Sequence, residues 1–304
     1  MTALAPVLYA APGSGLGHLV RAAAVCLALA RENISSRIVT HSPYAPGLAR
    51  LTGLAIDFIP GNRWLRLLPD YLDWLKPELA VLDTFPWGIR GEWAPGRIRP
   101  PRLVLLARRL KVSAYLEAAG LDWPPDSPNL ARIILAEPLD EDYLERLKTG
   151  GGEWRSLPGR IRFPADDFPT PLPEGLSGLM ADGLCGLIVH GGAEKETAAL
   201  IELARAAGKD EIDGRLAVIT PRPEGRLGVP AFEYFPAARL YDRARLVVTA
   251  VGYNCLAEMA GRPEKHHCLA FPRRYDDQAG RLAGPGAGIE DGGPAAAALI
   301  AAWL

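Results

Sequence analysis

The feature that most constrains the fold is a short apolar run that leads through a glycine-rich turn directly into an Ala- and Leu-rich stretch. Residues 6–11 form the run, which is typical of a parallel strand buried on both faces. Residues 12–18 form the turn, and residues 19–31 have the spacing of a helix. Because parallel strands need helical crossovers between them, this order predicts an α/β protein.

The same alternation continues along the chain, which has 304 residues. It predicts a doubly wound parallel sheet in each half. Strands are expected at 37–40, 56–59, 79–83, 103–106, 132–135, 216–220, 231–234 and 246–250, a second strand–loop–helix unit at 186–207, and helices at 64–76 and 294–304. A change to Gly, Pro and charged residues at 148–173 indicates the connection between domains. With a prior of about 150 residues per domain, we predict two domains, at 1–160 and 161–304.

Composition excludes some functional classes. The 34 basic and 35 acidic residues give a net charge of −1, so the overall charge does not favour a nucleic-acid partner. The four cysteines are far apart and form no C-x-x-C pair, which is typical of free thiols in a reducing compartment. No apolar run near the start is long enough to span a bilayer, and no charged segment of a signal peptide precedes it. We therefore expect a cytoplasmic protein.

The glycine-rich turn contains the first candidate for chemistry. Glycines between a buried strand and a helix let the backbone approach a ligand, and the helix N-terminus favours an anion such as phosphate. His18 stands where the dinucleotide fingerprint G-x-G-x-x-G needs its last glycine, which argues against a nicotinamide or flavin enzyme. An imidazole at a helix N-terminus is disfavoured as a cation, so it suits a neutral base. The alternative is a surface histidine that caps the loop.

The second candidate follows the predicted strand at 246–250. Gly252 provides the turn, Asn254 can cap the next helix, and Glu258 comes about one turn later. Open α/β sheets bind ligands at the carboxyl ends of their strands, and a carboxylate there can hold the two hydroxyls of a ribose. The alternative is an ordinary acidic residue of a first helical turn. An apolar run and a polar loop that can present acids and an amide to a sugar follow at 268–279.

These motifs resemble those of GT-B glycosyltransferases. The likeness lies in a G-x-G-H loop after the first strand, a G-x-N-x-x-x-E motif after a later strand, and a P-R-x-x-x-D-Q loop. Within that class the chain is similar to the MurG-like N-acetylglucosaminyltransferases and their bacterial relatives. The segment at 81–92 also resembles a stretch of predicted MurG-like transferases. The resemblance implies a GT-B fold of two Rossmann-like, doubly wound parallel-sheet domains that face a cleft. It also implies a nucleotide sugar, commonly a UDP sugar, bound mainly by the second domain.

The resemblance also implies a set of site residues. His18 and Asp83 are the candidate catalytic residues. The candidate nucleotide-sugar-binding residues are Gly15, Gly17, Arg162, Gly191, Gly192, Gly252, Asn254, Glu258, Asp277 and Gln278. Among these, Gly191, Gly192, Gly252 and Asn254 would lie near the diphosphate. Glu258 would bind the ribose, and Arg162 would face the nucleotide. Asp277 and Gln278 would hold hydroxyls of the donor sugar.

No metal or cofactor is expected beyond the donor substrate. The acidic pairs at 166–167 and 276–277 could be taken for ligands of a divalent ion, but the fold class implied here does not generally need one. His266, His267 and Cys268 make a poor metal site, because neighbours on a strand point to opposite faces. Helix N-termini at the site can stabilise the leaving diphosphate without a metal.

The function predicted from these observations is metal-independent and inverting transfer of a sugar from a nucleotide sugar to an unknown acceptor. One alternative is a nucleotide-sugar hydrolase, because the G-x-G-H-x-x-R loop ending at Arg21 also resembles hydrolases of activated amino sugars. Another is a degenerate or partner-dependent nucleotide-sugar-binding protein. If the acceptor is lipid-linked, residues 62–76 could touch a membrane surface, although a helix with one apolar core face explains them as well.

Overall fold

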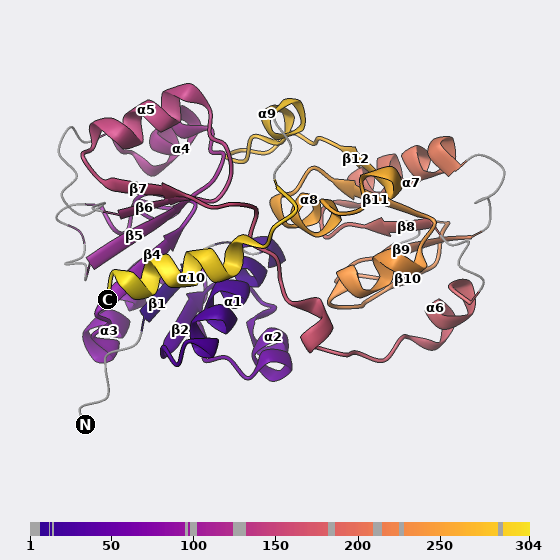
Figure 1. Ribbon diagram of the computed structural model, residues 1–304, viewed down its shortest axis with the longest axis horizontal. Coiled ribbons are helices and arrows are strands. Elements are labelled where there is room, and N and C mark those ends of the chain that lie inside the picture. The colour runs from indigo at the N-terminus through magenta and orange to yellow at the C-terminus, as the bar shows by residue number, and fades with distance from the viewer. Residues whose placement is uncertain are drawn as a thin grey trace. The chain divides into compact units, whose positions relative to one another are not determined.

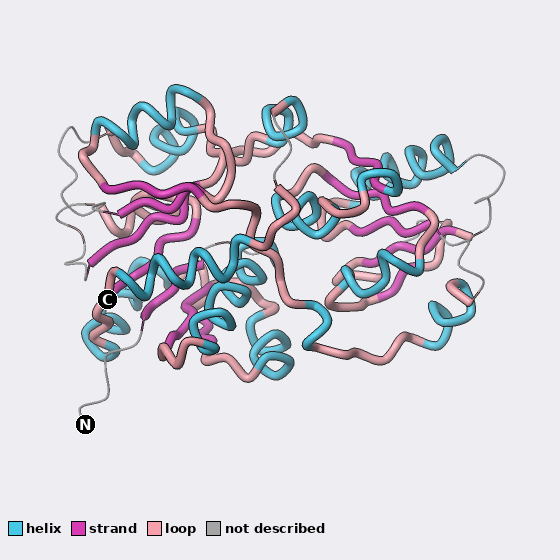
Figure 2. Tube along the Cα trace, viewed as in Figure 1, coloured by secondary structure: helices cyan, strands magenta, loops and turns pink. Residues whose placement is uncertain are grey.

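The computed structural model describes residues 7–11, 13, 15–94, 97, 102–123, 132–181, 186–208, 215–224, 228–284 and 288–304. It forms two compact units. The first unit combines Met1–Phe163 with Arg273–Leu304, and the second is Pro164–Pro272. Strands and helices alternate along the chain within each unit, as Figure 1 and Figure 2 show.

The first unit is built on a parallel sheet of seven strands over the described residues, in the order β3-β2-β1-β4-β5-β6-β7. The strands are β1 (Val7–Ala11), β2 (Ser36–Thr40), β3 (Ile56–Phe58), β4 (Leu79–Asp83), β5 (Arg102–Ala107), β6 (Arg132–Leu135) and β7 (Glu153–Ser156). The chain winds outward from β1 to β3 and then returns to β4 before it winds the other way. The strand order therefore reverses between β1 and β4, the place where open α/β sheets bind ligands.

Helices cover this sheet because their apolar residues recur every three or four positions. The helices are α1 (Leu16–Arg31), α2 (Ala45–Thr52), α3 (Trp64–Leu75), α4 (Val112–Ala119), α5 (Glu141–Thr149), α9 (Gln278–Ala283) and α10 (Gly292–Ala302). In α3, for example, Trp64, Leu68 and Leu72 are buried in one core cluster with residues of β1, β4 and β5. All five residues of β1 and of β4 are buried, which explains why both strands are apolar apart from Asp83 at the end of β4.

The last residues of the chain return to the first unit, where α10 packs along α1 (Figure 1). Glycines permit the start of α10 to approach the loop after β7 closely: a Cβ on Gly159 would lie 2.0 Å from a backbone oxygen of Glu290, and one on Gly292 would lie 2.2 Å from the Gly159 oxygen. The sequence pattern assigns 161–304 to the second domain. The structure differs from that expectation for residues 273–304, because the apolar α10 is buried against the first unit.

The second unit is built on a smaller parallel sheet, in the order β10-β9-β8-β11-β12. Its elements are β8 (Gly186–Val189), β9 (Leu216–Ile219), β10 (Ala231–Phe232), β11 (Leu246–Ala250), β12 (His266–Leu269), α6 (Glu174–Leu179), α7 (Glu194–Gly208), α8 (Tyr253–Met259) and the 3-10 helices η1 (Ala165–Asp167), η3 (Ala237–Arg243) and η4 (Pro263–Lys265). Here the strand order reverses between β8 and β11. Successive strand residues alternate between two clusters: Leu187 packs with α6 and η3, and Ile188 packs with α7.

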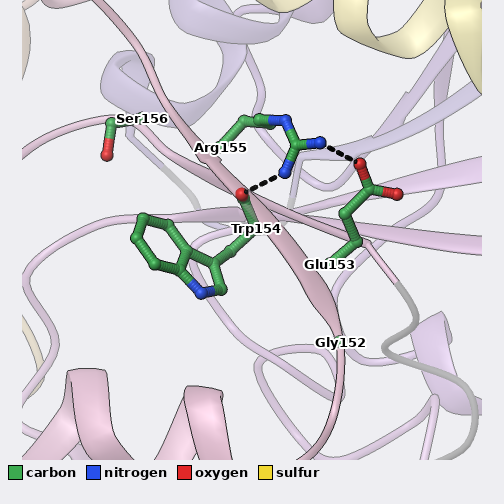
Figure 3. A pocket seen from close by; sticks show the side chains of 5 residues that line it. All are labelled: Gly152, Glu153, Trp154, Arg155 and Ser156. Atoms are coloured by element: carbon green, nitrogen blue, oxygen red, sulfur yellow. Dashed lines mark hydrogen bonds and ion pairs between the residues drawn. The ribbon is translucent and has the colours of Figure 1, made fainter.

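Strand β7 has no apolar pattern, and the sequence does not predict it. All four of its residues are exposed, which suits an edge strand. An open hollow of about 560 Å³ runs along it, lined by residues 152–156 (Figure 3). Arg155 pairs there with Glu153 at 2.6 Å and donates to the Trp154 carbonyl at 2.9 Å.

Candidate active site

The glycine loop of the first unit joins β1 to α1 at the point where the strand order reverses. Gly15 is the N-cap of α1, and its carbonyl accepts a hydrogen bond from Ser42 Oγ at 3.1 Å. Gly17 lies in the first turn of α1. Pro12 and Ser14, which also belong to this turn, lie outside the described residues.

Both candidate catalytic residues meet at this point. His18 Nδ1 lies 2.6 Å from Asp83 Oδ2, and Asp83 is the last residue of β4. The imidazole is 22% exposed, whereas the carboxylate is fully buried. Because an ionised carboxylate only accepts hydrogen bonds, Nδ1 must carry the proton. Nε2 is then the nitrogen with a lone pair, and it is available to a hydroxyl group.

Arg21, the last residue of the G-x-G-H-x-x-R loop, completes a group of three, although the sequence does not indicate that it contacts Asp83. Its Nε donates to Asp83 Oδ1 at 2.9 Å and its Nη2 donates to Asp83 Oδ2 at 2.6 Å, so the guanidinium grips the carboxylate with two parallel bonds. A longer contact, at 3.4 Å, runs from Nη2 to Thr84 Oγ1. The signal that could have found Arg21 is an arginine among buried alanines and leucines, one helical turn after His18.

The electrostatic environment keeps these groups in the states a base requires. Burial alone would raise the pKa of Asp83, but Arg21 and His18 beside it hold that pKa well below its usual range. Burial lowers the pKa of His18, and Arg21 and Arg108 lower it further, although Asp83 acts in the opposite direction. His18 is therefore neutral at pH 7, beside a carboxylate that is ionised.

The glycine loop and a second histidine fix the imidazole in place. Gly13 has a φ of +122°, and a Cβ on it would lie 3.1 Å from His18 Cδ2. The Gly13 N–H donates to His41 Nε2 at 2.8 Å, and burial lowers the pKa of His41 so that it remains an acceptor. On its other side, the His18 ring stacks on Phe85 with centroids 5.8 Å apart. The loop conformation therefore requires glycine at position 13.

A second buried ionic cluster lies beside this group and connects the end of the chain to the sheet. Arg281 of α9 donates to Glu137 at 2.7 Å and to Asp276 at 2.6 Å. Arg108, which follows β5, donates to Asp276 at 2.8 Å. Burial would raise the pKa of Glu137 and Asp276, but the arginines hold both pKa values below their usual range. The contacts of Arg281 with Glu137 and of Arg108 with Asp276 connect residues more than 140 positions apart, so the sequence could not show them.

Three predicted nucleotide-sugar-binding residues belong to the first unit rather than the second. The Asp277 carboxylate accepts from the Gly280 N–H at the start of α9 and pairs with Arg109 at 3.2 Å. Gln278 is buried in the first turn of α9. The Arg162 side chain donates to the Ile289 carbonyl. Their contacts within the protein therefore hold the returning chain, and their predicted roles toward a ligand remain predictions.

In the second unit, Gly191 and Gly192 follow β8 at the point of strand reversal. A Cβ on Gly192 would lie 2.2 Å from His190 Nε2 and 2.5 Å from Glu196 Oε2, so any other residue there would displace these two side chains. His190 Nε2 and Glu196 Oε2 are 2.9 Å apart, and the side chain of His190 is 5% exposed. This pair connects the glycine loop to the first turn of α7. Sequence reasoning missed it.

The neighbouring loop after β11 contains the other predicted residues. Gly252 is the N-cap of α8, and no side chain caps this helix, so the expectation that Asn254 caps it is wrong. Asn254 instead lies within the first turn. Burial raises the pKa of Glu258 to about 7, although the Tyr241 hydroxyl donates to Glu258 Oε2 at 2.9 Å and opposes the shift. Tyr241, on η3, is a further residue that the sequence did not indicate.

Gly191, Gly192, Gly252 and Asn254 therefore follow the carboxyl ends of β8 and β11, two adjacent strands, and Glu258 lies four residues after Asn254 on α8. This arrangement combines backbone N–H groups with a carboxylate that can accept from hydroxyls. Among the described residues, no group of three or more His, Cys, Asp and Glu side chains could hold a metal ion. In the same part of the chain, no helix is long and apolar enough to cross a membrane.

No protein-family model matches the chain, and no curated protein sequence matches it. Solved structures do match. Spinosyn forosaminyltransferase SpnP is 18% identical, with a TM-score of 0.55, over 92% of this chain and 83% of that chain. Spinosyn rhamnosyltransferase SpnG complexed with thymidine diphosphate is 15% identical, with a TM-score of 0.51, over 97% of this chain and 94% of that chain. UDP-GlcNAc 2-epimerase from Methanocaldococcus jannaschii, in complex with UDP-GlcNAc and UDP, is 11% identical, with a TM-score of 0.57, over 98% of this chain and 99% of that chain.

These structures match nearly the whole chain, including both parallel sheets. The chain has the GT-B fold. The doubly wound α/β class predicted from the strand alternation is thereby confirmed, and so is the GT-B fold that the motif resemblance implied. At 11% to 18% identity the likeness concerns the fold, so the activity has to be argued from the residues of this chain.

Proposed function

We propose that the protein is a glycosyltransferase that moves a sugar from a nucleoside-diphosphate sugar to an acceptor hydroxyl. The observation that carries this proposal is the His18–Asp83 pair, at 2.6 Å, at the point of strand reversal in a GT-B fold. Such a pair can take a proton from a hydroxyl group and stabilise the imidazolium that results. The motifs quoted above support a transferase that resembles the MurG-like enzymes.

In the proposed reaction, the acceptor oxygen attacks the anomeric carbon while the bond to the diphosphate breaks. His18 Nε2 takes the proton from the attacking hydroxyl, and the electron pair of the broken bond leaves with the diphosphate. A single displacement of this kind inverts the anomeric centre. Asp83 stays ionised and holds the protonated imidazole through Nδ1.

The second unit would hold the donor. Backbone N–H groups of Gly191 and Gly192, and of the loop at Gly252 and Asn254, would bind the diphosphate, because such groups stabilise an anion without a metal. The Glu258 carboxylate would accept hydrogen bonds from the ribose hydroxyls. A UDP sugar is the first donor to test, and a thymidine-diphosphate sugar is the second.

Hydrolysis of a nucleotide sugar is the second candidate. The observation that favours it is the G-x-G-H-x-x-R loop, in which Arg21 and His18 both contact the Asp83 carboxylate. Because the imidazole is partly exposed, water could occupy the place of the acceptor hydroxyl. The bond that breaks and the role of His18 are the same in both reactions, so only the identity of the nucleophile separates them.

The experiment is donor turnover followed by ¹H NMR, with UDP-GlcNAc and a thymidine-diphosphate sugar, in the presence and absence of pooled acceptors that include lipid phosphates. Transfer predicts nucleoside diphosphate release that depends on an acceptor, and hydrolysis predicts release and a free sugar without one. Epimerisation of the bound sugar, with no release, would contradict both. His18→Gln is the matched inactive variant, and an added chelator should change nothing because no metal is required.

The proposal also places the reaction in the cytoplasm, consistent with the free thiols of the three described cysteines. A lipid-linked acceptor would call for peripheral membrane contact through residues 62–76, where Leu65 and Trp74 are exposed. Co-sedimentation with anionic vesicles tests that contact. Donor binding without turnover would instead favour a partner-dependent or degenerate protein.

A further inference from the structure

We propose that Arg21 is a positioning residue for this reaction, which orients the Asp83 carboxylate so that His18 keeps its proton on Nδ1 and presents Nε2 as the base. The inference rests on the proposed function for its catalytic meaning. Its geometric content, the tautomer of His18, can be measured without any substrate.

The three side chains come from two rigid elements. His18 and Arg21 are three residues apart on α1, which places them on the same face of the helix, and Asp83 ends the adjacent strand β4. The side chains of Arg21 and Asp83 are both fully buried. A buried carboxylate held by only one donor could rotate, whereas the two bonds from Nε and Nη2 fix its plane.

The fixed plane decides which His18 nitrogen is protonated. With Oδ2 held 2.6 Å from Nδ1, the Nδ1–H tautomer gains a charge-assisted hydrogen bond that the other tautomer lacks. Arg21 Nη2 lies 3.3 Å from the same Nδ1, and two N–H donors cannot bond to each other. The guanidinium therefore opposes an imidazolium at this position while it stabilises the carboxylate.

Other charged groups also reach His18 and enter any pH dependence. They come from separate elements: Arg108 follows β5, Asp276 lies on the returning chain, and His41 follows β2. Arg108 opposes protonation of His18, and Asp276 favours it. Because Arg108 and Asp276 are themselves paired at 2.8 Å, their effects on His18 partly cancel.

The test is Arg21→Lys, which keeps the buried charge but replaces the two-bond grip with a single ammonium donor. Arg31→Lys, at the exposed end of the same helix, is the matched control. Protein labelled with ¹⁵N-histidine reports the tautomer and titration of each imidazole by NMR, and His18→Gln assigns the His18 signals.

We expect wild type and Arg31→Lys to hold His18 as the neutral Nδ1–H tautomer at pH 7. We expect Arg21→Lys to show a mixture of tautomers and, with donor and acceptor, a kcat lower by about 10- to 100-fold at unchanged KM. An unchanged tautomer and kcat in Arg21→Lys would overturn the inference.

If Arg21→Lys does not fold, the wild-type spectrum alone decides, since an Nε2–H tautomer or an imidazolium at pH 7 would refute the geometry. A chain that shows the predicted tautomer change but transfers and hydrolyses no sugar would refute the proposed reaction and leave the positioning geometry intact. The two failures are therefore distinguishable.

Discussion

Donor binding should depend on pH through Glu258. Burial raises the pKa of this carboxyl to about 7 in the free protein, and only the ionised form can accept hydrogen bonds from both ribose hydroxyls. Below its pKa the carboxyl must lose a proton before the donor binds, so the Kd rises as pH falls. Between pH 8 and pH 6 the ionised fraction falls from about 90% to about 10%, which predicts a Kd about tenfold weaker at pH 6.

The assay is isothermal titration of a UDP sugar from pH 5.5 to 8.5. A nucleotide sugar is preferred to free UDP, because the terminal phosphate of UDP has its own pKa near 6. Glu258→Gln should weaken binding by about 1.5 to 3 kcal/mol, the cost of a lost hydrogen bond to a charged group, and abolish the pH dependence. Tyr241→Phe removes the hydroxyl that donates at 2.9 Å, so the midpoint should move to higher pH.

A Kd that stays constant from pH 6 to pH 8 in the wild type would refute this reasoning. So would a Glu258→Gln variant that keeps the wild-type slope, because the titrating group would then lie elsewhere. A ligand without the 2′-hydroxyl offers a further check, since it should show weaker binding at high pH and a smaller change with pH.

Three further predictions concern other groups. His18→Gln should leave the donor Kd unchanged and lower kcat by about 10²- to 10⁴-fold, and comparable loss of binding would contradict its role as a base. Arg281→Met leaves a fully buried glutamate without its strongest partner, so urea denaturation should show a loss of about 3 to 5 kcal/mol, against less than about 1 kcal/mol for the exposed Arg146→Met. Gly192→Ala should reduce donor affinity, because its Cβ would lie 2.2 Å from a buried imidazole nitrogen, whereas Gly191→Ala makes only ordinary contacts at 3.5 Å; equal affinities in calorimetry would argue against this fit.

The fold could be predicted where strands are buried on both faces. β4 and β11 have the predicted bounds, because each contains four apolar residues among its five and lies between polar segments, a pattern typical of a buried strand. β7 could not be predicted, because its four residues are exposed and show no apolar pattern. Such a sequence suits a strand only at the edge of a sheet. The return of α10 to the first unit also escaped prediction, because an Ala-rich helix shows that it must be buried but not against which partner.

The site was predictable where a motif is local. His18 follows from the glycine loop, and its contact with Asp83 depends on the strand order that places β4 beside β1. Arg21 belongs to the G-x-G-H-x-x-R motif, but its two bonds to the Asp83 carboxylate become known only from the structure. The pairing of Arg108 with Asp276 joins residues 168 positions apart, and no spacing in the sequence indicates it. Site residues within one local motif could thus be predicted from the sequence. The buried charged residues that shift their pKa values could not.

The measurement that tests the central claim most directly is a thermal-shift panel of uridine, thymidine, guanosine and adenosine diphosphates and their sugars, on wild type, Glu258→Gln and His18→Gln. A ligand that binds only the folded protein raises its apparent stability, by about 2.7 kcal/mol at a concentration 100 times its Kd. The account predicts a clear shift with one nucleotide and its sugar, lost in Glu258→Gln and retained in His18→Gln. No shift with any of these ligands, or an equal shift in Glu258→Gln, would contradict it.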